Sequence, residues 1–447
     1  MFCEIFLESV SARKHDTLQK MRIELAYGKT GLKAELPEGL RYQFLEARSA
    51  VALDDSAAAL EAAMDAPIGT APLAELARGK KTAAISVCDI TRPAPNRLVL
   101  PPLLKRLEQG GISSENVTVL IATGLHRPAT EAEIHEIIGP ELHGKIRVLN
   151  HHAKMLTEHR YLGHTSTGTP VHIDERFMAA DLHITLGFIE PHLMLGFSGG
   201  RKLIAPGLAA QETIKVLHSP KFMRDQRAVE GSVQDNPLHR ELLEIARMAR
   251  HDFLVDVSLT RDRKIAQVFA GHPEQAHRQG MEFVGKVMLE RIEEPVDAVI
   301  TTSAGYPLDL TFYQTVKGIT AASHIVKPGG RILVISACTE GAGAPEFCEM
   351  LEKFPTPQAF LDHVAANPVE VDQWQLEKLA LVCRDKELLF HVPGLEARYQ
   401  HRLWGLTFAD VQEAIAAVLH GLDANARIAV IPEGPYVLAR VEEGVLA

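Results

Sequence analysis

The feature that most constrains the fold of this 447-residue chain is an alternation of short apolar runs with helical segments. From residue 82 it reads TAAISVC, PNRLVLPPLLKRLEQGG, VTVLIATG and ATEAEIHEIIG, where Thr130 and Glu133 have the spacing of a helix capping box. The later runs DLHITLGF and FLVDVSL predict further strands. This βαβα order predicts an α/β protein with mainly parallel sheets flanked by helices.

The alternation restarts near residue 290, which predicts two domains. A charged stretch, KVMLERIEEPVD, leads there into a new βαβ unit made of AVITTSAG, LTFYQTVKGITAASHIV and RILVISA. We therefore assign residues 21–290 to an N-terminal domain and residues 291–447 to a C-terminal α/β domain. At the start, MRIELAYGKTGLKAELPEGL alternates like two strands around a Gly-Lys turn, so residues 1–20 are expected to be an N-terminal tail.

Composition excludes several classes of partner and compartment. The 57 acidic and 47 basic side chains give a formal charge of -10, which argues against a face for nucleic acid or anionic membrane. No apolar run approaches the roughly 20 residues of a membrane span, and the first residues lack the pattern of a secretory signal. The five cysteines form no CxxC pair and indicate reduced thiols. A soluble, cytoplasmic protein is expected.

Four stretches rich in polar residues lie between a predicted strand and a predicted helix. They are CDITRPAPN (88–96), ATGLHRPAT (122–130), GFIEPHLMLGFSGGRK (187–202) and SAGYPLDLTFYQTVKG (303–318). In open α/β sheets, ligands bind in the crevice beyond the carboxyl ends of the strands. The four loops are therefore expected to meet at one ligand site.

Several of these residues also fit an ordinary structural role. Asp89 and Arg92 suit a helix cap and a surface ion pair, and His126 suits a turn. His192 follows Pro191 among apolar residues, where desolvation would lower its pKa toward that of a usable base. A lone buried histidine is nevertheless usually structural.

The glycine, lysine and glutamine positions leave similar alternatives open. Gly199 and Gly200 would let backbone N–H groups approach an anion, yet they lack the spacing of a P-loop or of GxGxxG. Lys202 fits either a surface charge or a lysine that forms covalent adducts. Gln314 and Lys317, spaced i,i+3, fit either a solvated helix face or a carboxylate site.

The sequence shows no HExxH and no compact His/Asp triad, so the polypeptide alone lacks a recognisable zinc ligand set. If a metal ion binds, most of its donors must come from something other than the protein.

Taken together and in order, these motifs resemble the nickel-pincer lactate racemase family. The resemblance rests on DITRP, TGLHRP, PHLMLGFSGGRKLIAPG, YQTVKG and His218, which lies sixteen residues after Lys202. It covers most of the chain from about residue 21. It implies a two-domain α/β enzyme with its active site in the cleft between the domains, an isomerase that inverts C2 of a 2-hydroxy acid by reversible hydride transfer.

The resemblance also implies a cofactor, the nickel pincer nucleotide, which is a pyridinium-3-thioamide-5-thiocarboxylic acid mononucleotide with Ni(II). Lys202 would tether it through a thioamide, His218 would ligate the nickel, Asp89 would help place the nucleotide, and Gly199 and Gly200 would let it lie against the backbone. No side chain accepts hydride, so a cofactor must do so. Three pincer donors and one histidine suit square-planar nickel(II). Separate cofactor-biosynthesis proteins are implied as partners.

By the same resemblance, His126 and His192 flank the substrate and alternate as acid and base. Arg92, Gln314 and Lys317 would hold the substrate carboxylate and ketone, with Tyr313 and Trp374 nearby. Lactate is the eponymous substrate, and no residue fixes the group on C2. A non-catalytic nucleotide- or phosphate-binding protein is the alternative, against which the two histidines argue. A hydrolase fits less well, because no nucleophile elbow is present.

Overall fold

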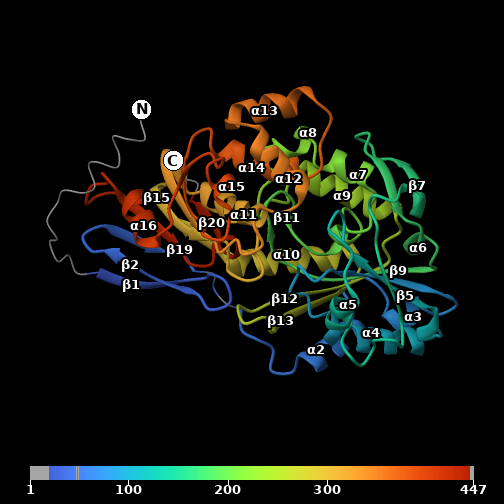
Figure 1. Ribbon diagram of the computed structural model, residues 1–447. Helices are drawn as coiled ribbons and strands as arrows, with labels where there is room; N and C mark the ends of the chain where they lie inside the picture. Colours follow the sequence, from blue (N-terminus) through green and yellow to red (C-terminus); the bar gives the residue numbers. More distant parts are fainter. Residues whose placement is uncertain (1–19, 47, 49, 443–447) are drawn as a thin grey trace, which may run out of the picture.

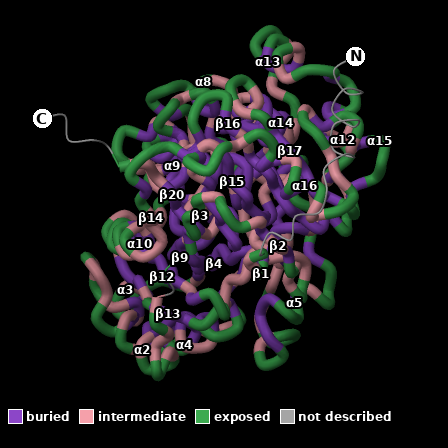
Figure 2. Tube along the Cα trace, turned by 90° about the vertical axis from the view of Figure 1, so that its left-hand side faces the viewer, coloured by how far each residue is buried: buried purple, intermediate pink, exposed green. Residues whose placement is uncertain are grey.

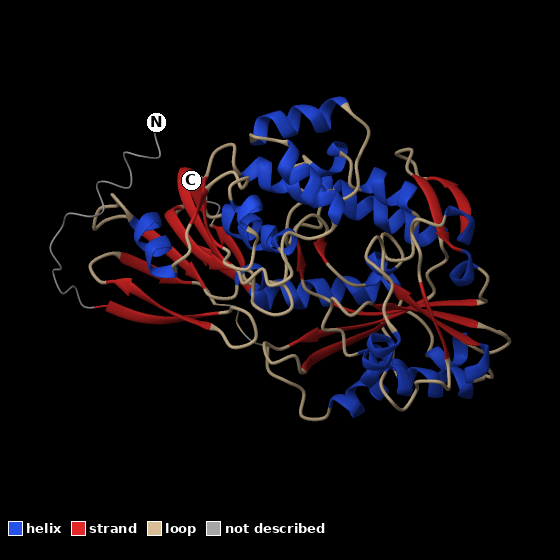
Figure 3. Ribbon diagram, in the orientation of Figure 1, coloured by secondary structure: helices blue, strands red, loops and turns tan. Residues whose placement is uncertain are grey.

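Two six-stranded sheets organise the protein. Helices lie around both of them (Figures 1 and 3), and the computed structural model describes residues 20–46, 48 and 50–442. The first sheet has the order β13-β12-β9-β4-β5-β6, parallel throughout except for β13, which runs antiparallel to β12. Its strands are β4 (Ala83–Cys88), β5 (Val117–Ala122), β6 (Arg147–Asn150), β9 (Leu182–Phe188), β12 (Phe253–Leu259) and β13 (Ile265–Gly271).

Helices cover both faces of this sheet, so its central strands β4 and β9 are buried along their whole length. One face packs on α2 (Ser56–Asp65), α3 (Leu73–Leu76), α4 (Asn96–Gln109) and α5 (Glu131–Ile138). The other packs on α6 (Glu175–Met178), α7 (Gln211–Leu217), α8 (Pro220–Met223) and α9 (Pro237–Met248). The capping box predicted at Thr130 and Glu133 is confirmed at the start of α5.

The second sheet is parallel throughout, with the order β18-β17-β16-β15-β19-β3. Its strands are β3 (Arg41–Phe44), β15 (Val296–Thr302), β16 (Val326–Ile335), β17 (Glu387–His391), β18 (Leu406–Thr407) and β19 (Arg427–Ile431). One face packs on α11 (Phe312–Ser323), α12 (Pro345–Lys353), α13 (Pro357–Ala366), α14 (Gln373–Val382) and α15 (Ala397–Gln400). The other packs on α16 (Val411–Leu419) and on the hairpin of β1 (Lys20–Leu25) and β2 (Leu32–Pro37). The predicted α/β fold is confirmed.

The strand at residues 41–44, β3, pairs with the second sheet, although the sequence analysis placed residues 21–290 together in the N-terminal domain. The predicted hairpin forms as β1 and β2, and β3 then pairs with β19. The alternation of the hairpin predicted its strands correctly, but nothing local specifies the partner of β3. The domain limits stay predictions, and the expected tail at residues 1–20 lies outside the described residues except for Lys20, the first residue of β1.

Both sheets reverse their strand order at one point. The chain passes from β4 through β5 to β6 on one side, and then places β9, β12 and β13 on the other. The second sheet runs from β15 through β16 and β17 to β18 before β19 returns to the far side of β15. The loops that follow the strands at such a reversal diverge and leave a crevice.

The remaining elements lie outside the two sheets. They are β7 (His159–His164) with β8 (Pro170–Asp174), β10 (Pro191–His192) with β11 (Gly196–Phe197), α10 (Pro273–Met288), which packs on β12 and β13, and β14 (Leu289–Ile292) with β20 (Leu438–Val441). Ion pairs also cross between the halves, from Arg224 to Glu377 at 2.6 Å and from His324 to Glu230 at 2.6 Å. The buried residues consequently run through the middle of the molecule (Figure 2).

Among the described residues, none of the helices is both long enough and apolar enough to pass through a bilayer.

Candidate active site

The reversal point of the first sheet opens onto one cavity, of about 1160 Å³ including its open mouth. Every site residue named from the sequence lines it, except Gly200. The loops after β4, β5 and β9 form one side, with α7 beyond them, and α11 and the start of α14 form the other. The four predicted loops therefore do meet, and the site lies between the two sheets.

Asp89 and His126 form the first pair of groups in the cavity. The buried Asp89 carboxylate contacts Nδ1 of His126 at 2.7 Å and accepts a hydrogen bond from the Thr91 hydroxyl at 2.6 Å. Burial opposes its ionisation, but His126, Thr91 and Arg92 outweigh this effect and hold the pKa of Asp89 at about 2. Because an ionised carboxylate only accepts, Nδ1 of His126 carries a proton, and in the neutral ring Nε2 carries the lone pair.

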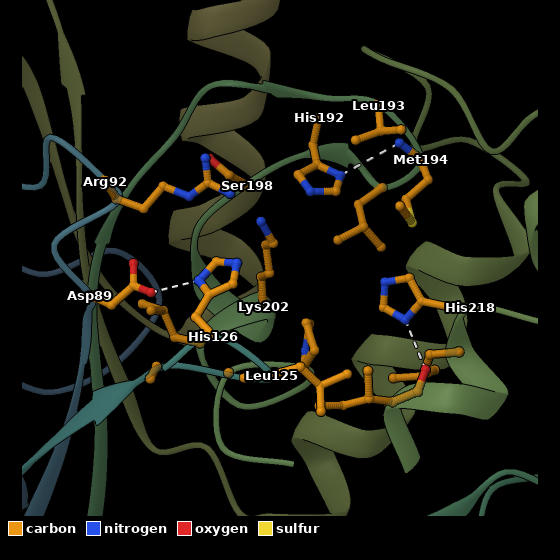
Figure 4. Close-up of a pocket in the computed structure, with 18 of the residues that line it drawn as sticks. Asp89, Arg92, Leu125, His126, His192, Leu193, Met194, Ser198, Lys202 and His218 are labelled. Carbon is orange, nitrogen blue, oxygen red and sulfur yellow. Dashed lines mark hydrogen bonds and ion pairs between the residues drawn. The ribbon is translucent and has the colours of Figure 1, made fainter. Parts of the chain in front are cut away.

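His192 lies across the cavity from His126, with the side chain of Lys202 between the two rings in the view of Figure 4. Burial, followed by the positive charges of Lys202 and Lys317, holds the pKa of His192 well below its ordinary value. Its Nδ1 faces the backbone N–H of Met194 at 3.5 Å. Both rings are therefore placed to exchange a proton with a molecule bound between them.

Three cationic side chains converge on the same space, although the chain as a whole is acidic. Burial and the Arg92 charge lower the pKa of Lys202 to about 7, and burial, Arg92 and Lys202 lower the pKa of Lys317 well below its usual range. Glu190, 3.9 Å from Arg92, offsets part of this charge. A bound anion would stabilise the cationic cluster of Arg92, Lys202 and Lys317, and in its absence Lys202 has a substantial neutral fraction.

The two glycines are required mainly by packing behind the cavity. Gly199 has φ of 80°, and a Cβ there would lie 2.4 Å from an oxygen of Asp256. The N–H of Gly200 donates to the same carboxylate at 2.9 Å, and a Cβ at Gly200 would lie 3.0 Å from the ring of His277. The glycines thus let the backbone before Lys202 approach Asp256 on β12, while only Gly199 reaches the cavity wall.

His218 ends α7 and presents one ring nitrogen toward the cavity. Its Nδ1 donates to the Ile214 carbonyl at 2.8 Å, so Nε2 carries the lone pair. Burial is the main cause that lowers the pKa of His218 to about 4, and the ring lies 4.3 Å from that of Trp374. A neutral imidazole whose second nitrogen is held by a carbonyl is the usual form of a metal ligand.

No group of three or more His, Cys, Asp or Glu side chains in the described part of the chain is arranged to hold a metal ion.

Helix α11 presents three of the predicted residues to the cavity. Lys317 lies one turn after Tyr313, and Gln314 lies beside them with its Oε1 buried and unpartnered. The Tyr313 hydroxyl accepts a hydrogen bond from the Trp374 indole at 2.9 Å, and its carbonyl accepts one from the Gln375 amide at 2.8 Å. These bonds fix the start of α14 to the start of α11.

Sequence reasoning missed three acids at or behind the site. Glu190 lies between two motif residues, and Asp256 interrupts the apolar strand FLVDVSL, which is a signal that could have identified it. Burial raises the pKa of Asp256 to about 7. Asp372 lines the cavity two residues before Trp374, and in the sequence it resembles an ordinary helix cap. Only the tertiary structure distinguishes it from one.

Comparison with known sequences matches most of the chain to one family. The sequence model of the lactate racemase N-terminal domain matches residues 27–231, and that of the lactate racemase C-terminal domain matches residues 292–439. The chain is 33% identical over 424 residues to the lactate racemase of Thermoanaerobacterium thermosaccharolyticum, covering 94% of this chain and 99% of that protein. It is 33% identical over 384 residues to the lactate racemase of Lactiplantibacillus plantarum, covering 85% and 90%.

Solved structures support the fold independently. The lactate racemase apoprotein from T. thermosaccharolyticum superimposes with a TM-score of 0.87 at 32% identity, covering 94% of this chain and all of that one. A Thermotoga maritima protein superimposes with a TM-score of 0.66 at 15% identity, covering 88% of this chain and all of that one, and shows a common fold only.

Proposed function

The chain belongs to the lactate racemase family, and on that premise we propose that it is a racemase or epimerase that inverts C2 of a 2-hydroxy acid, lactate or a related acid. The observation that carries the proposal is the arrangement of Lys202 and His218 around one cavity that also contains two histidine bases. The cytoplasmic location and the dependence on proteins that make the cofactor are part of the same proposal.

The residues fit a nickel pincer nucleotide. Lys202 has a pKa of about 7, so its neutral amine is available at neutral pH to form a thioamide tether. His218 offers Nε2 as a single neutral donor, which matches a nickel ion that obtains three donors from the pincer. The cofactor, when bound, would supply the group that accepts hydride from C2 and returns it.

The protein's own contribution to the chemistry is proton transfer. The C2 hydroxyl proton passes to one histidine as the C2–H bond breaks, and the resulting planar keto acid can be reduced from either face. Nε2 of His126 is the ready base, because Asp89 holds the proton on Nδ1. His192, when protonated, gives a proton to the ketone oxygen on the opposite side, so the two rings hold one proton between them throughout. The lowered pKa of His192 makes its protonated form a stronger acid than an ordinary imidazolium.

The cationic cluster would bind the substrate carboxylate. Arg92 and Lys317 lie at the cavity wall with their charges only partly balanced by Glu190 and Asp89. The unpartnered Oε1 of Gln314 gives a hydroxyl or ketone group a partner beside them, since an amide offers both an acceptor and a donor. Desolvated cations bind a carboxylate more strongly than exposed ones do.

The proposal is tested by producing the protein in a cell that makes the cofactor and measuring its intact mass, its nickel content and its turnover of lactate. A mass increment on Lys202, one nickel per chain and interconversion of enantiomers are expected. Lys202→Arg should abolish the adduct, because a guanidinium stays protonated, whereas Lys105→Arg, an exposed position on α4, should not.

An adduct on another lysine would contradict the assignment of Lys202. A loaded protein that turns over no acid in a panel from lactate to sugar acids would favour the alternative of a nucleotide- or phosphate-binding protein, which the cationic cluster would also serve.

A further inference from the structure

Asp372 is an acid in the cavity to which no role has been assigned so far. It occupies the N-cap position of α14, where an aspartate normally accepts hydrogen bonds from the first helical N–H groups. Its side chain makes no such bond, and its backbone takes the left-handed conformation with φ of 65°. The carboxylate instead lines the cavity, within hydrogen-bonding reach of the Tyr313 hydroxyl.

The groups around Asp372 include one hydrogen-bond donor, the Tyr313 hydroxyl, and several charged side chains. The Trp374 indole donates to the Tyr313 hydroxyl at 2.9 Å, which leaves the tyrosine proton free to point at Asp372. The charged or titratable groups that face it from other elements are His126, Lys154 and Glu346. Burial raises the pKa of Asp372 to about 6, so the group is mainly ionised at neutral pH.

The position of Asp372 relative to Lys317 indicates which part of a bound substrate could contact the Asp372 carboxylate. Tyr313 and Lys317 lie on one face of α11, four residues apart, which is about 6 Å along the axis. If Lys317 holds the C1 carboxylate, a substituent on C2 that points along α11 toward the start of the helix would meet Tyr313 and Asp372. An apolar substituent there would remove water from the carboxylate and leave Tyr313 as its one donor, and a second carboxylate would repel it.

We propose that Asp372 is a specificity-determining residue that selects 2-hydroxy acids with a hydroxyl group beyond C2 over acids with an apolar group or a second carboxylate there. This inference rests on the proposed function. The hydroxyl donates to the Asp372 carboxylate, a hydrogen bond to a charged acceptor and therefore a strong one. The substrate class is thus that of polyhydroxylated acids, of which 2,3-dihydroxypropanoate is the smallest.

The test uses the cofactor-loaded protein and three racemisation substrates: lactate, 2,3-dihydroxypropanoate and malate. For the unmodified protein, kcat/KM is expected to be highest for 2,3-dihydroxypropanoate and lowest for malate. In Asp372→Asn, the ratio of kcat/KM for 2,3-dihydroxypropanoate to that for malate should fall roughly 10- to 100-fold, the size expected when a charged acceptor is lost.

Asp410→Asn is the matched control, since Asp410 caps α16 through the N–H groups of Gln412 and Glu413 at 2.8 and 3.0 Å and lies outside the cavity. Its substrate ratio should not change. Replacement by alanine gives a readout independent of turnover: Asp410→Ala should lower the unfolding midpoint more than Asp372→Ala does, because only Asp410 caps its helix.

The outcomes separate this inference from the proposed function. Loaded protein that turns over none of the three acids and no other acid in the panel from lactate to sugar acids contradicts the proposed function. Loaded protein that racemises lactate, but prefers lactate or malate to 2,3-dihydroxypropanoate, overturns the assignment of Asp372 alone. An unchanged substrate ratio in Asp372→Asn overturns it equally.

Discussion

The two sheets reverse their strand order in the same way, yet only one of the two crevices is open. At the first, the loops after β4 and β9 leave room for a cavity lined by Asp89, His192 and Lys202. At the second, between β15 and β19, the turn of the β1–β2 hairpin fills the equivalent place. A strand reversal therefore provides a position for a ligand, and the side chains and backbone that enter it decide whether one binds.

The filled crevice uses its polar groups to hold backbone. Asp309 accepts hydrogen bonds from the N–H of Gly28 at 2.6 Å and of Ala337 at 3.4 Å. The N–H of Tyr306 donates to the Gly28 carbonyl, and that of Ala26 donates to the Pro432 carbonyl, both at 2.8 to 2.9 Å. In the open crevice the corresponding acid, Asp89, orients His126 instead. The loop after the central strand of each sheet thus carries an aspartate that holds backbone in one sheet and the His126 ring in the other.

The largest expected effect distinguishes the histidines in the open crevice of the first sheet from a histidine beside the filled crevice of the second. His126→Ala and His192→Ala should each lower kcat in both directions by about 10²–10⁴-fold, because every passage between enantiomers needs one base and one acid. His391→Ala is the control, since His391 ends β17 at the filled edge and stacks on Tyr27 at 6.3 Å. Racemisation rates and nickel content of loaded proteins provide the measurement. If all three variants racemised the substrate at the same rate, the proposed difference between the open and the filled crevice would be wrong.

The second prediction concerns Asp309, which supports the filled crevice. Asp309→Ala leaves two backbone N–H groups without their acceptor and should lower the free energy of unfolding by about 2–3 kcal/mol. The turnover number of the loaded, folded protein should stay within about twofold, because Asp309 does not line the open cavity. Chemical denaturation and initial rates would measure both quantities. A large loss of turnover with unchanged stability would mean that the second crevice takes part in catalysis.

The third prediction compares a glycine at each edge. Gly199 and Gly28 both have positive φ, and alanine at Gly28 costs about 1–2 kcal/mol in backbone strain. Gly199, with φ of 80° and ψ of -179°, lies in a region that side chains other than glycine essentially avoid, so alanine costs at least as much there. At Gly199 the new Cβ would also lie 2.4 Å from an oxygen of Asp256, whereas at Gly28 it meets no atom within 4 Å. Gly199→Ala should therefore be destabilised by at least about 1 kcal/mol more than Gly28→Ala. Equal unfolding midpoints would show that Asp256 moves aside at little cost.

The smallest expected effect is a pH dependence within the open crevice. The pKa of Lys202 is lowered, so its reactive neutral form accumulates as the pH rises through about 7 rather than near the ordinary value of 10.5. In unloaded protein, acylation of Lys202, followed by peptide mass analysis between pH 6 and 9, should rise and level off above pH 8. Acylation of the ε-amine of a free lysine derivative should keep increasing over the same pH range, because its pKa is near 10.5. If acylation of Lys202 followed the same pH profile as the free lysine derivative, the Lys202 amine would be fully solvated.

Much of this site could be predicted from sequence, because its residues occur in short motifs after strands. The polar loops at 88–96, 122–130 and 187–202 follow predicted strands, and parallel strands carry their ligands at the carboxyl edge. Their convergence with 303–318 is confirmed by the cavity they share. The roles of the individual residues stay predictions. Asp372 was missed because an aspartate before a helix normally indicates a cap.

The sequence by itself determined the alternation of strands and helices, the hairpin near the N-terminus and the loops that carry the unusual residues, because these depend on the periodicity of neighbouring residues. Only the tertiary structure decided that β3 joins the second sheet, that one crevice is filled and the other open, and that Lys202 has a pKa of about 7. These properties arise from contacts between residues far apart in the chain. Burial and the charge of Arg92 set the pKa of Lys202, and neither can be read from the residues that adjoin it.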